Sequence, residues 1–225
     1  MRWRDFRFEH RHIRAYEMAE KTAPVVCSLD YEECGEALIA RCSQLGGRSF
    51  NLISVSHLQW DEELSPWPAD SIITKNDRFT GSADTLLHVL TEGIIPETEA
   101  AMGWKPSVRV LAGYSMSGLF ALYAAFKTSL FNAIVSASGS LWYPEITVFA
   151  VANTPAATVR RAYFSIGDKE SRTRHPYLKT TESRTREVVE TLGNKGIDTI
   201  FELNPGNHFN ESTLREAKGI VWALR

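Results

Sequence analysis

Residues 108–126 (VRVLAGYSMSGLFALYAAF) constrain the fold more than any other stretch, because their character changes at a single serine. The residues before that serine form a short β-branched and apolar run, which is typical of a buried strand. Residues 119–126 are apolar nearly all round, which is typical of a buried helix. The sequence therefore predicts a strand, a sharp turn at Ser115 and a helix, in that order.

The turn sequence GYSMSG has the features of a nucleophile elbow. Small residues must flank the pivot, because a Cβ there would collide with the neighbouring strand or helix. Gly113, Ser117 and Gly118 meet this need, Ser117 through its size. The pivot residue, Ser115, would project its hydroxyl at a helix N-terminus, where unpaired N–H groups favour negative charge. Because Ser117 holds the second glycine position of GxSxG, a tight turn without chemistry is the alternative interpretation.

The composition favours a single domain spanning residues 1–225, since this length suffices for one well-filled core and is short for two. The chain carries 25 Lys and Arg against 27 Asp and Glu, so it has no basic field to attract nucleic acid or anionic lipid. The sequence contains no apolar run long enough to suggest a membrane partner. Three cysteines without CxxC spacing indicate reduced thiols in a cytoplasmic protein, and we expect no metal site.

The rest of the chain alternates between strand and helix patterns, which indicates an α/β fold with a mostly parallel central sheet and helices on both faces. The expected strands are residues 6–16, 23–29, 51–56, 131–140, 161–167 and 197–203. The expected helices are one opened by Asp30 and stopped at 46–47, and those at 84–102, 180–192 and 213–224. Gly93 and Pro96 predict an interruption of the second helix. Thr213 with Glu216 predicts a capping box for the last helix.

Residues 57–72 (HLQWDEELSPWPADSI) are rich in Trp and Pro, and their apolar residues follow neither the helical nor the strand periodicity. They therefore predict a loop at the carboxyl end of a strand. Loops in this position line the site in open α/β sheets. Trp60 and Trp67 would then form an apolar wall for a substrate, or alternatively cover the core. His57 and Tyr114, the residue before the elbow serine, are further candidates for the pocket.

A serine hydroxyl needs a base within hydrogen-bond reach, and that base needs a group to hold its tautomer. His208 follows the last expected strand in the constrained loop NPGNHF, and Asp168 and Glu170 follow the strand before it. The order of Ser115, an acid and His208 is the order of an α/β-hydrolase triad. Glu170 is favoured over Asp168 as the acid because of its longer reach and its GxxE spacing.

The oxyanion of a tetrahedral intermediate also needs backbone donors. One is expected to be the N–H of Met116, directly after the nucleophile. The other is expected from Ser56 or His57, in the loop after the strand at 51–56.

The chain also resembles a known family, the serine esterases of the α/β-hydrolase superfamily that include siderophore esterases and are related to esterase D. The resemblance covers nearly the whole chain and rests on the motifs DEELSPW (61–67), AGYSMSGLFALY (112–123), SASGSLWYP (136–144), YFSIGDKE (163–170), NPGNHF (204–209) and AKGIVW (217–222). It implies that Ser115 is the nucleophile, that His208 is the base and that the acid is Glu170.

We therefore expect a serine carboxylesterase that hydrolyses a small-molecule ester without a metal or an organic cofactor. Acyl transfer to an alcohol on the same three residues and a catalytically silent binding scaffold are the alternatives. The sequence specifies neither the natural substrate nor the oligomeric state.

Overall fold

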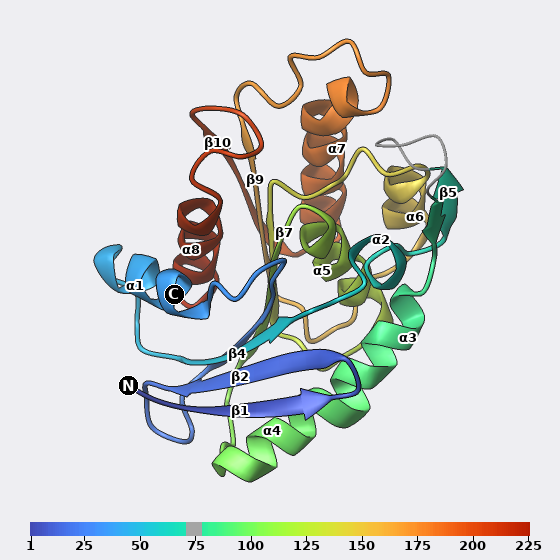
Figure 1. Cartoon of the computed structure of the whole chain (residues 1–225). Coiled ribbons are helices and arrows are strands. Elements are labelled where there is room, and N and C mark those ends of the chain that lie inside the picture. The colour runs from blue at the N-terminus through green and yellow to red at the C-terminus, as the bar shows by residue number, and fades with distance from the viewer. Residues whose placement is uncertain (71–77) are drawn as a thin grey trace.

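An eight-stranded sheet forms the centre of the computed structural model, which describes residues 1–70 and 78–225 (Figure 1). Its strands, in spatial order, are β1 (Arg2–Phe8), β2 (Arg11–Glu17), β4 (Asn51–Ser56), β3 (Val25–Leu29), β7 (Arg109–Tyr114), β8 (Ala133–Ala137), β9 (Arg161–Gly167) and β10 (Asp198–Asn204). The pairs β1–β2 and β2–β4 are antiparallel, and the pairs from β4 to β10 are parallel. The expectation of a mostly parallel sheet is confirmed.

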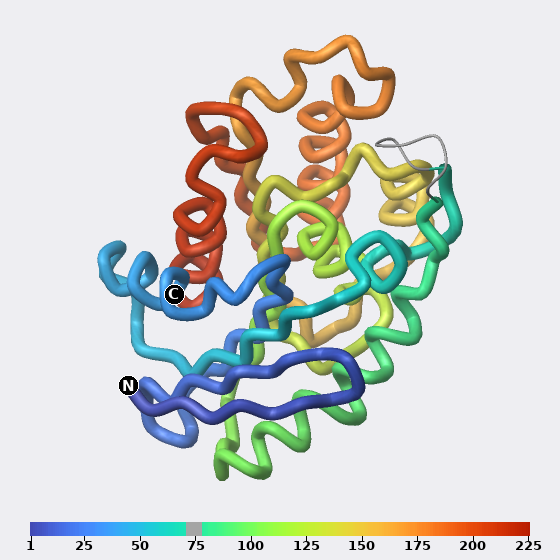
Figure 2. The backbone as a smooth tube through the Cα atoms, in the orientation of Figure 1, coloured from blue at the N-terminus to red at the C-terminus, as the bar shows by residue number. Residues whose placement is uncertain are grey.

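Helices cover both faces of this sheet (Figures 1 and 2). On one face, α1 (Gly35–Gln44) packs against α8 (Ser212–Ala223), which lies over β7, β8 and β9. The other face carries α5 (Met116–Lys127), α6 (Ile146–Ala152), α7 (Thr181–Asn194) and the continuous segment of α3 (Ala83–His88), the π-helix η1 (Val89–Ile94) and α4 (Ile95–Met102). Because side chains alternate along a strand, Leu111 of β7 belongs to the core on the α5 side and Val110 to the core on the α8 side.

The smaller elements are α2 (Trp60–Glu63), the 3₁₀-helix η2 (Leu178–Thr180) and a two-stranded sheet of β5 (Pro68–Asp70) and β6 (Arg78–Thr80). The prediction of a loop over residues 57–72 is wrong for α2 and β5, and its last two residues lie outside the described part of the chain. Among the described residues, no helix combines the length and apolar character needed to cross a bilayer.

The N-terminal segment departs from its prediction, because residues 6–16 belong to two strands of a hairpin and not to one strand. The chain reverses beside Glu9, which has φ 56°. No glycine or asparagine marks that turn in the sequence, so the usual signal of a left-handed turn is absent. The helix expected to open at Asp30 begins at Gly35 instead, because the N–H of Asp30 donates to the carbonyl of Val55 and continues the sheet.

The helical segment from α3 to α4 is continuous where the sequence predicts an interruption. Its wide π-turn contains Gly93, where a Cβ would lie 2.8 Å from the ring of Phe8 on β1. Gly93 therefore allows β1 to pack against this helix. Pro96 lies at the start of α4, directly after the π-turn, where it removes one N–H donor from the hydrogen bonds of this continuous segment.

The register of the parallel strands brings several loops to one edge of the sheet. Leu29, the last residue of β3, pairs with Gly113 near the end of β7, and Asn204 at the end of β10 pairs with Gly167 at the end of β9. The segments that follow these strands therefore begin at the same edge, where ligands bind in open α/β sheets.

Candidate active site

The turn between β7 and α5 has the backbone geometry of a nucleophile elbow. Ser115 has φ 61° and ψ −120°, a positive-φ conformation that few non-glycine residues adopt. Gly113 makes room for the turn, because a Cβ there would lie 2.5 Å from the carbonyl carbon of Ser117. Gly118 lies close to Gly139, whose Cα would be 3.0 Å from an added Cβ. Both glycines thus have the steric role that the sequence predicts.

Ser117 contributes more than small size to this turn. Its Oγ accepts the N–H of Tyr114 and donates to the carbonyl oxygen of the same residue, each at 2.8 Å, and the side chain is fully buried. One hydroxyl therefore satisfies two backbone groups beside the nucleophile position. The interpretation of Ser117 by size alone is wrong.

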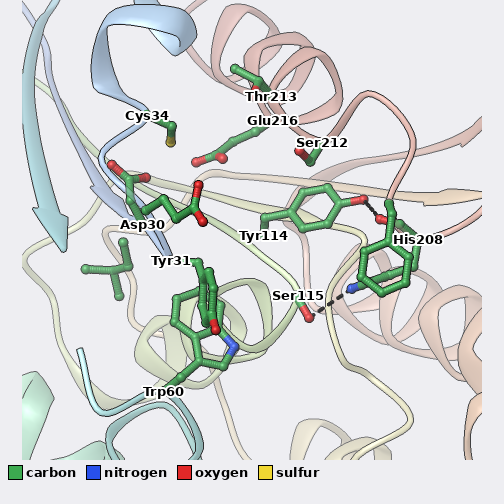
Figure 3. Close-up of a pocket in the computed structure, with 13 residues that line it drawn as sticks. Asp30, Tyr31, Cys34, Trp60, Tyr114, Ser115, His208, Ser212, Thr213 and Glu216 are labelled. Atoms are coloured by element: carbon green, nitrogen blue, oxygen red, sulfur yellow. Dashed lines mark hydrogen bonds between the residues drawn. The ribbon is translucent and has the colours of Figure 1, made fainter. Parts of the chain in front are cut away.

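The hydroxyl of Ser115 lies at one end of a hydrogen-bonded row of three side chains. Its Oγ is 3.0 Å from Nε2 of His208, a contact visible in Figure 3. Nδ1 of His208 is 2.8 Å from Oε2 of Glu170. The structure therefore brings together, from the ends of β7, β10 and β9, the three residues that the sequence selects as nucleophile, base and acid.

Glu170 is surrounded by donors that favour its charged form. Oε1 accepts hydrogen bonds from Ser138 Oγ at 2.8 Å and from the N–H of Gly167 at 2.5 Å. Nη1 of Arg215 also donates to Oε1, at 2.8 Å. Burial alone would raise the pKa of Glu170, but the hydrogen bond and charge of His208, together with the other donors, bring the pKa below its usual value. Glu170 is therefore a carboxylate at neutral pH.

Asp168, the other candidate acid, supports the loop that carries His208. Its Oδ1 accepts the N–H of Gly206 at 2.7 Å, and its Oδ2 lies 4.0 Å from Arg172. Among the described residues, only Glu170 is close enough to His208 to form an ion pair with it.

Arg215 is a residue of this site that the sequence analysis did not identify. Its guanidinium, 1 % exposed, donates to Glu170 and to the carbonyl oxygens of Pro205 and Asn207 at 3.0 and 2.9 Å. It therefore links the acid to the loop preceding His208. The sequence signal was weak, because one arginine in an amphipathic helix normally faces solvent.

Tyr114 also holds this loop in place. Its hydroxyl donates to the carbonyl oxygen of His208 at 2.5 Å and accepts a hydrogen bond from Arg215 Nη1 at 3.2 Å. The two rings of Tyr114 and His208 lie 5.3 Å apart between centroids. Burial raises the pKa of the Tyr114 hydroxyl, so this group stays protonated and can donate at neutral pH.

A cavity of about 440 Å³ opens beside Ser115 and His208 (Figure 3). Tyr114 and Trp60 line it, as the sequence predicts for pocket residues. The other lining residues are Leu29, Asp30, Tyr31, Glu32, Cys34, Phe209, Ser212, Thr213 and Glu216.

Two predicted pocket residues lie elsewhere. Trp67 packs against Tyr143 and Phe149, with ring centroids 6.0 and 5.5 Å away, and its Nε1 donates to the carbonyl of Pro144. It covers the core, which was the alternative interpretation. His57 is exposed at the end of β4 and does not line the cavity. The assignment of Trp67 and His57 to the pocket is therefore wrong.

The prediction of Ser56 or His57 as an oxyanion donor is also wrong. Both residues follow β4, and β3 lies between β4 and the nucleophile strand β7. Ser56 pairs with His12 on the far side of β4. On this side of β7 the neighbouring strand is β3, and the residues that follow β3, Asp30 and Tyr31, both line the cavity. Met116 remains in place as the first residue of α5.

The cavity also contains two buried carboxyl groups that the sequence analysis did not assign to the site. Asp30 is 3 % exposed and Glu216 is 4 % exposed. Burial raises the pKa of Asp30. Burial and then the charge of Asp30 raise the pKa of Glu216 to about 8. The predicted capping box of Thr213 and Glu216 is wrong, because α8 begins without a side-chain cap and Glu216 bonds to Ser28 on β3.

The family described as "Putative esterase" matches residues 55–212, which is more than half of the chain and includes the elbow, Glu170 and His208. The chain belongs to this esterase family. The membership of an esterase family and the α/β-hydrolase fold, both expected from the sequence, are thereby confirmed.

Individual proteins that are similar to this chain agree with its placement in the family. Over 140 residues the chain is 30 % identical to the uncharacterized protein YbbA of Bacillus subtilis, a match that spans 60 % of the chain and only 55 % of YbbA. Its fold is similar to that of an IroE-like serine hydrolase from Shewanella oneidensis (TM-score 0.79, 17 % identity, 99 % of this chain and 80 % of the other). A siderophore hydrolase, EstA from Aspergillus nidulans, is also similar (TM-score 0.73, 18 % identity, 98 % and 93 %).

Proposed function

We propose that this esterase is a serine carboxylesterase that hydrolyses a small-molecule ester through an acyl-enzyme on Ser115. The observation that carries the proposal is the row of Ser115, His208 and Glu170, with hydrogen bonds of 3.0 and 2.8 Å, at the edge of a cavity. A serine beside a histidine that is itself oriented by a carboxylate is the arrangement that activates a hydroxyl for acyl transfer.

In the first half-reaction, Oγ of Ser115 attacks the ester carbonyl carbon while Nε2 of His208 takes the hydroxyl proton. Glu170 accepts the Nδ1–H of His208, which leaves Nε2 free as the base and stabilises the imidazolium that forms. The tetrahedral intermediate then collapses. The bond to the alcohol oxygen breaks, and His208 returns its proton to that oxygen.

The negative charge on the carbonyl oxygen develops at the N-terminus of α5. The N–H of Met116 is in the first turn of this helix, where backbone donors have no partner within the helix. The second donor in this mechanism is the N–H of Tyr31, because Tyr31 follows β3 and lines the cavity with Ser115. Both donors are backbone groups and are therefore held by the fold itself.

In the second half-reaction, water replaces the alcohol. His208 removes a proton from the water, the hydroxide oxygen bonds to the acyl carbon, and the ester bond to Oγ of Ser115 breaks. The proton on His208 passes to Oγ, which restores the free enzyme and releases the carboxylic acid.

Labelling with a fluorophosphonate tests this function, because the reagent phosphonylates only an activated serine. We expect one adduct, located on Ser115 by peptide mass spectrometry, and hydrolysis of short p-nitrophenyl esters that is lost in proportion to labelling. Ser140→Ala is the matched control, because it removes a neighbouring hydroxyl and keeps Ser115. The Oγ of Ser140 lies 3.3 Å from that of Ser115. An adduct on Ser140 or Ser117, or full activity after labelling, would refute the mechanism.

A further inference from the structure

The wall of the cavity opposite the nucleophile is acidic. Figure 3 shows Glu216 extending from α8 toward the region of Asp30 and Cys34, away from Ser115 and His208. Glu32 lines the same cavity. We call Asp30, Glu32 and Glu216 the acidic wall.

Ser28 joins the two buried members of this wall. Its Oγ is 2.5 Å from Oδ1 of Asp30 and 2.9 Å from Oε1 of Glu216. A hydroxyl has only one hydrogen to donate, so it cannot satisfy two carboxylates at once. Ser54 donates to the second oxygen of Asp30, so Asp30 has two serine partners and is the better acceptor. The hydrogen of Ser28 therefore goes to Asp30, and Glu216 is the protonated acid that donates to Ser28 Oγ.

The acidic wall also lacks a cation. None of the ion pairs in the described part of the chain involves Asp30 or Glu216. Oε2 of the buried Glu216 has no hydrogen-bond partner among the described residues. A buried glutamate is stable in its charged form only beside a positive group, so Glu216 stays protonated until such a group is present. The missing partner is expected from a molecule that enters the cavity.

The shape and chemistry of the surroundings favour an organic cation over a metal ion. In the described residues no group of three or more His, Cys, Asp or Glu side chains is placed to hold a metal. Next to the acidic wall, Tyr31 and Trp60 meet edge to face with centroids 5.2 Å apart, and both line the cavity. Aromatic faces attract ammonium and guanidinium groups, and the same rings pack against an alkyl chain.

We propose that the acidic wall, with Tyr31 and Trp60, is a subsite for a positively charged alkylammonium group of the ester substrate. The proposal rests on the proposed function for the identity of the substrate as an ester, but binding of the cation does not depend on catalysis. When the cation binds, Glu216 releases its proton to solvent and the carboxylate pairs with the ammonium group.

Calorimetric titration of the Ser115→Ala variant with hexylammonium chloride and with hexanol tests the subsite without any reaction. We expect the cation to bind at least about tenfold more tightly than the alcohol of equal length. Glu216→Gln on the same background should remove this difference, whereas Glu190→Gln, on the exposed face of α7, should leave it unchanged. Equal affinities for the two ligands, or a preference that survives Glu216→Gln, would overturn the proposal.

Tyr31→Leu provides a second variant that does not disturb the buried wall, since Tyr31 is 72 % exposed. It should reduce the cation preference severalfold. In the active enzyme, ω-aminoacyl p-nitrophenyl esters of increasing chain length should have a higher kcat/KM than alkanoyl esters of the same length. Absence of all ester hydrolysis together with selective hexylammonium binding would refute the proposed function and leave the subsite standing. A higher kcat/KM for the alkanoyl ester at every chain length would refute the subsite but not the proposed function.

Discussion

At the scale of single residues, the two acids after β9 have different partners and should differ in effect. Ser115→Ala should lower kcat by about 10⁶-fold, because it removes the nucleophile. Glu170→Gln should lower kcat by about 10³- to 10⁴-fold, since the neutral amide cannot hold the same histidine tautomer. Asp168→Asn retains an oxygen acceptor for Gly206 and should cost less than about tenfold. Steady-state kinetics with p-nitrophenyl butyrate measure all three. An Asp168→Asn loss as large as that of Glu170→Gln would reverse the assignment.

Arg215 should act on the reaction through its neighbours. Its positive charge, 2.8 Å from Glu170, offsets part of the negative charge with which that carboxylate stabilises the imidazolium of His208. Arg215→Met removes this positive charge, and its removal stabilises the imidazolium. The acidic limb of the pH profile of kcat/KM should therefore move to higher pH by about one unit. Activity should also fall, because the carbonyls of Pro205 and Asn207 lose their donor.

Two variants separate this effect from general loosening of the fold. Arg215→Lys keeps the charge and should keep the position of the acidic limb, while kcat still falls. Lys218→Met removes a cation one helical turn away that bonds to Glu202 and Asn204 of β10 without touching His208 or Glu170. It should leave the profile unchanged. A profile that does not move in Arg215→Met would mean that the arginine only stabilises the loop.

The sequence selected the three side chains that the structure brings together, but not the residues that hold them in place. Ser115, Glu170 and His208 are recognisable because strand ends carry nucleophile, acid and base in a known order. Arg215, Asp30 and Glu216 were missed, because each is a charged residue whose burial depends on contacts between distant segments. Glu216 even matched a local capping pattern, and the pairing with Ser28 on β3, 188 residues away, overrides it.

At the scale of elements, the elbow should tolerate no added carbon at Gly113. A Cβ there would lie 2.5 Å from backbone and side-chain atoms of Ser117, so β7 and α5 would have to separate. Gly113→Ala should lower the free energy of unfolding by about 2–4 kcal/mol. Gly193→Ala, in α7, is the matched control, because the nearest atom to its Cβ is 3.4 Å away. This variant should be neutral or slightly stabilising. Denaturant unfolding measures both, and equal stabilities would contradict the steric account.

Elements with a strong periodicity of apolar residues were predicted well. Elements whose bounds depend on contacts with distant segments of the chain were not. β4 and β9 have the bounds that their apolar runs indicate, and α5 follows the elbow as expected. The sequence predicts one strand where β1 and β2 form a hairpin, since no turn residue marks the reversal at Glu9. The expectation that Ser56 or His57 is the second oxyanion donor fails for a related reason. Nothing local in the sequence says that β3, and not β4, lies beside β7.

At the scale of the whole molecule, burial of Glu216 should make stability depend on pH. Its pKa of about 8 in the folded state lies above that of an exposed glutamate, so the folded protein binds more protons between these values. Stability is therefore highest below about pH 4.5 with respect to this group, and it declines as the pH rises through 8. The decline should amount to a few kcal/mol at most.

Glu216→Gln should flatten this decline, because the amide does not titrate. Thermal unfolding at a series of pH values compares it with Glu190→Gln, which should keep the slope of the parent protein. If Glu216→Gln keeps that slope as well, another group is responsible and Glu216 is not protonated in the folded state.

The separation of Ser115, Glu170 and His208 along the chain has a consequence for refolding. His208 lies 93 residues from Ser115 and 38 from Glu170, and the three side chains meet only through the pairing of β7, β8, β9 and β10. Contacts this distant in sequence form late, because a long segment of chain must first be ordered. During refolding, recovery of fluorophosphonate labelling should therefore lag behind recovery of helical circular dichroism. Labelling of Ser115 would therefore report when the pairing of β7, β8, β9 and β10 is complete.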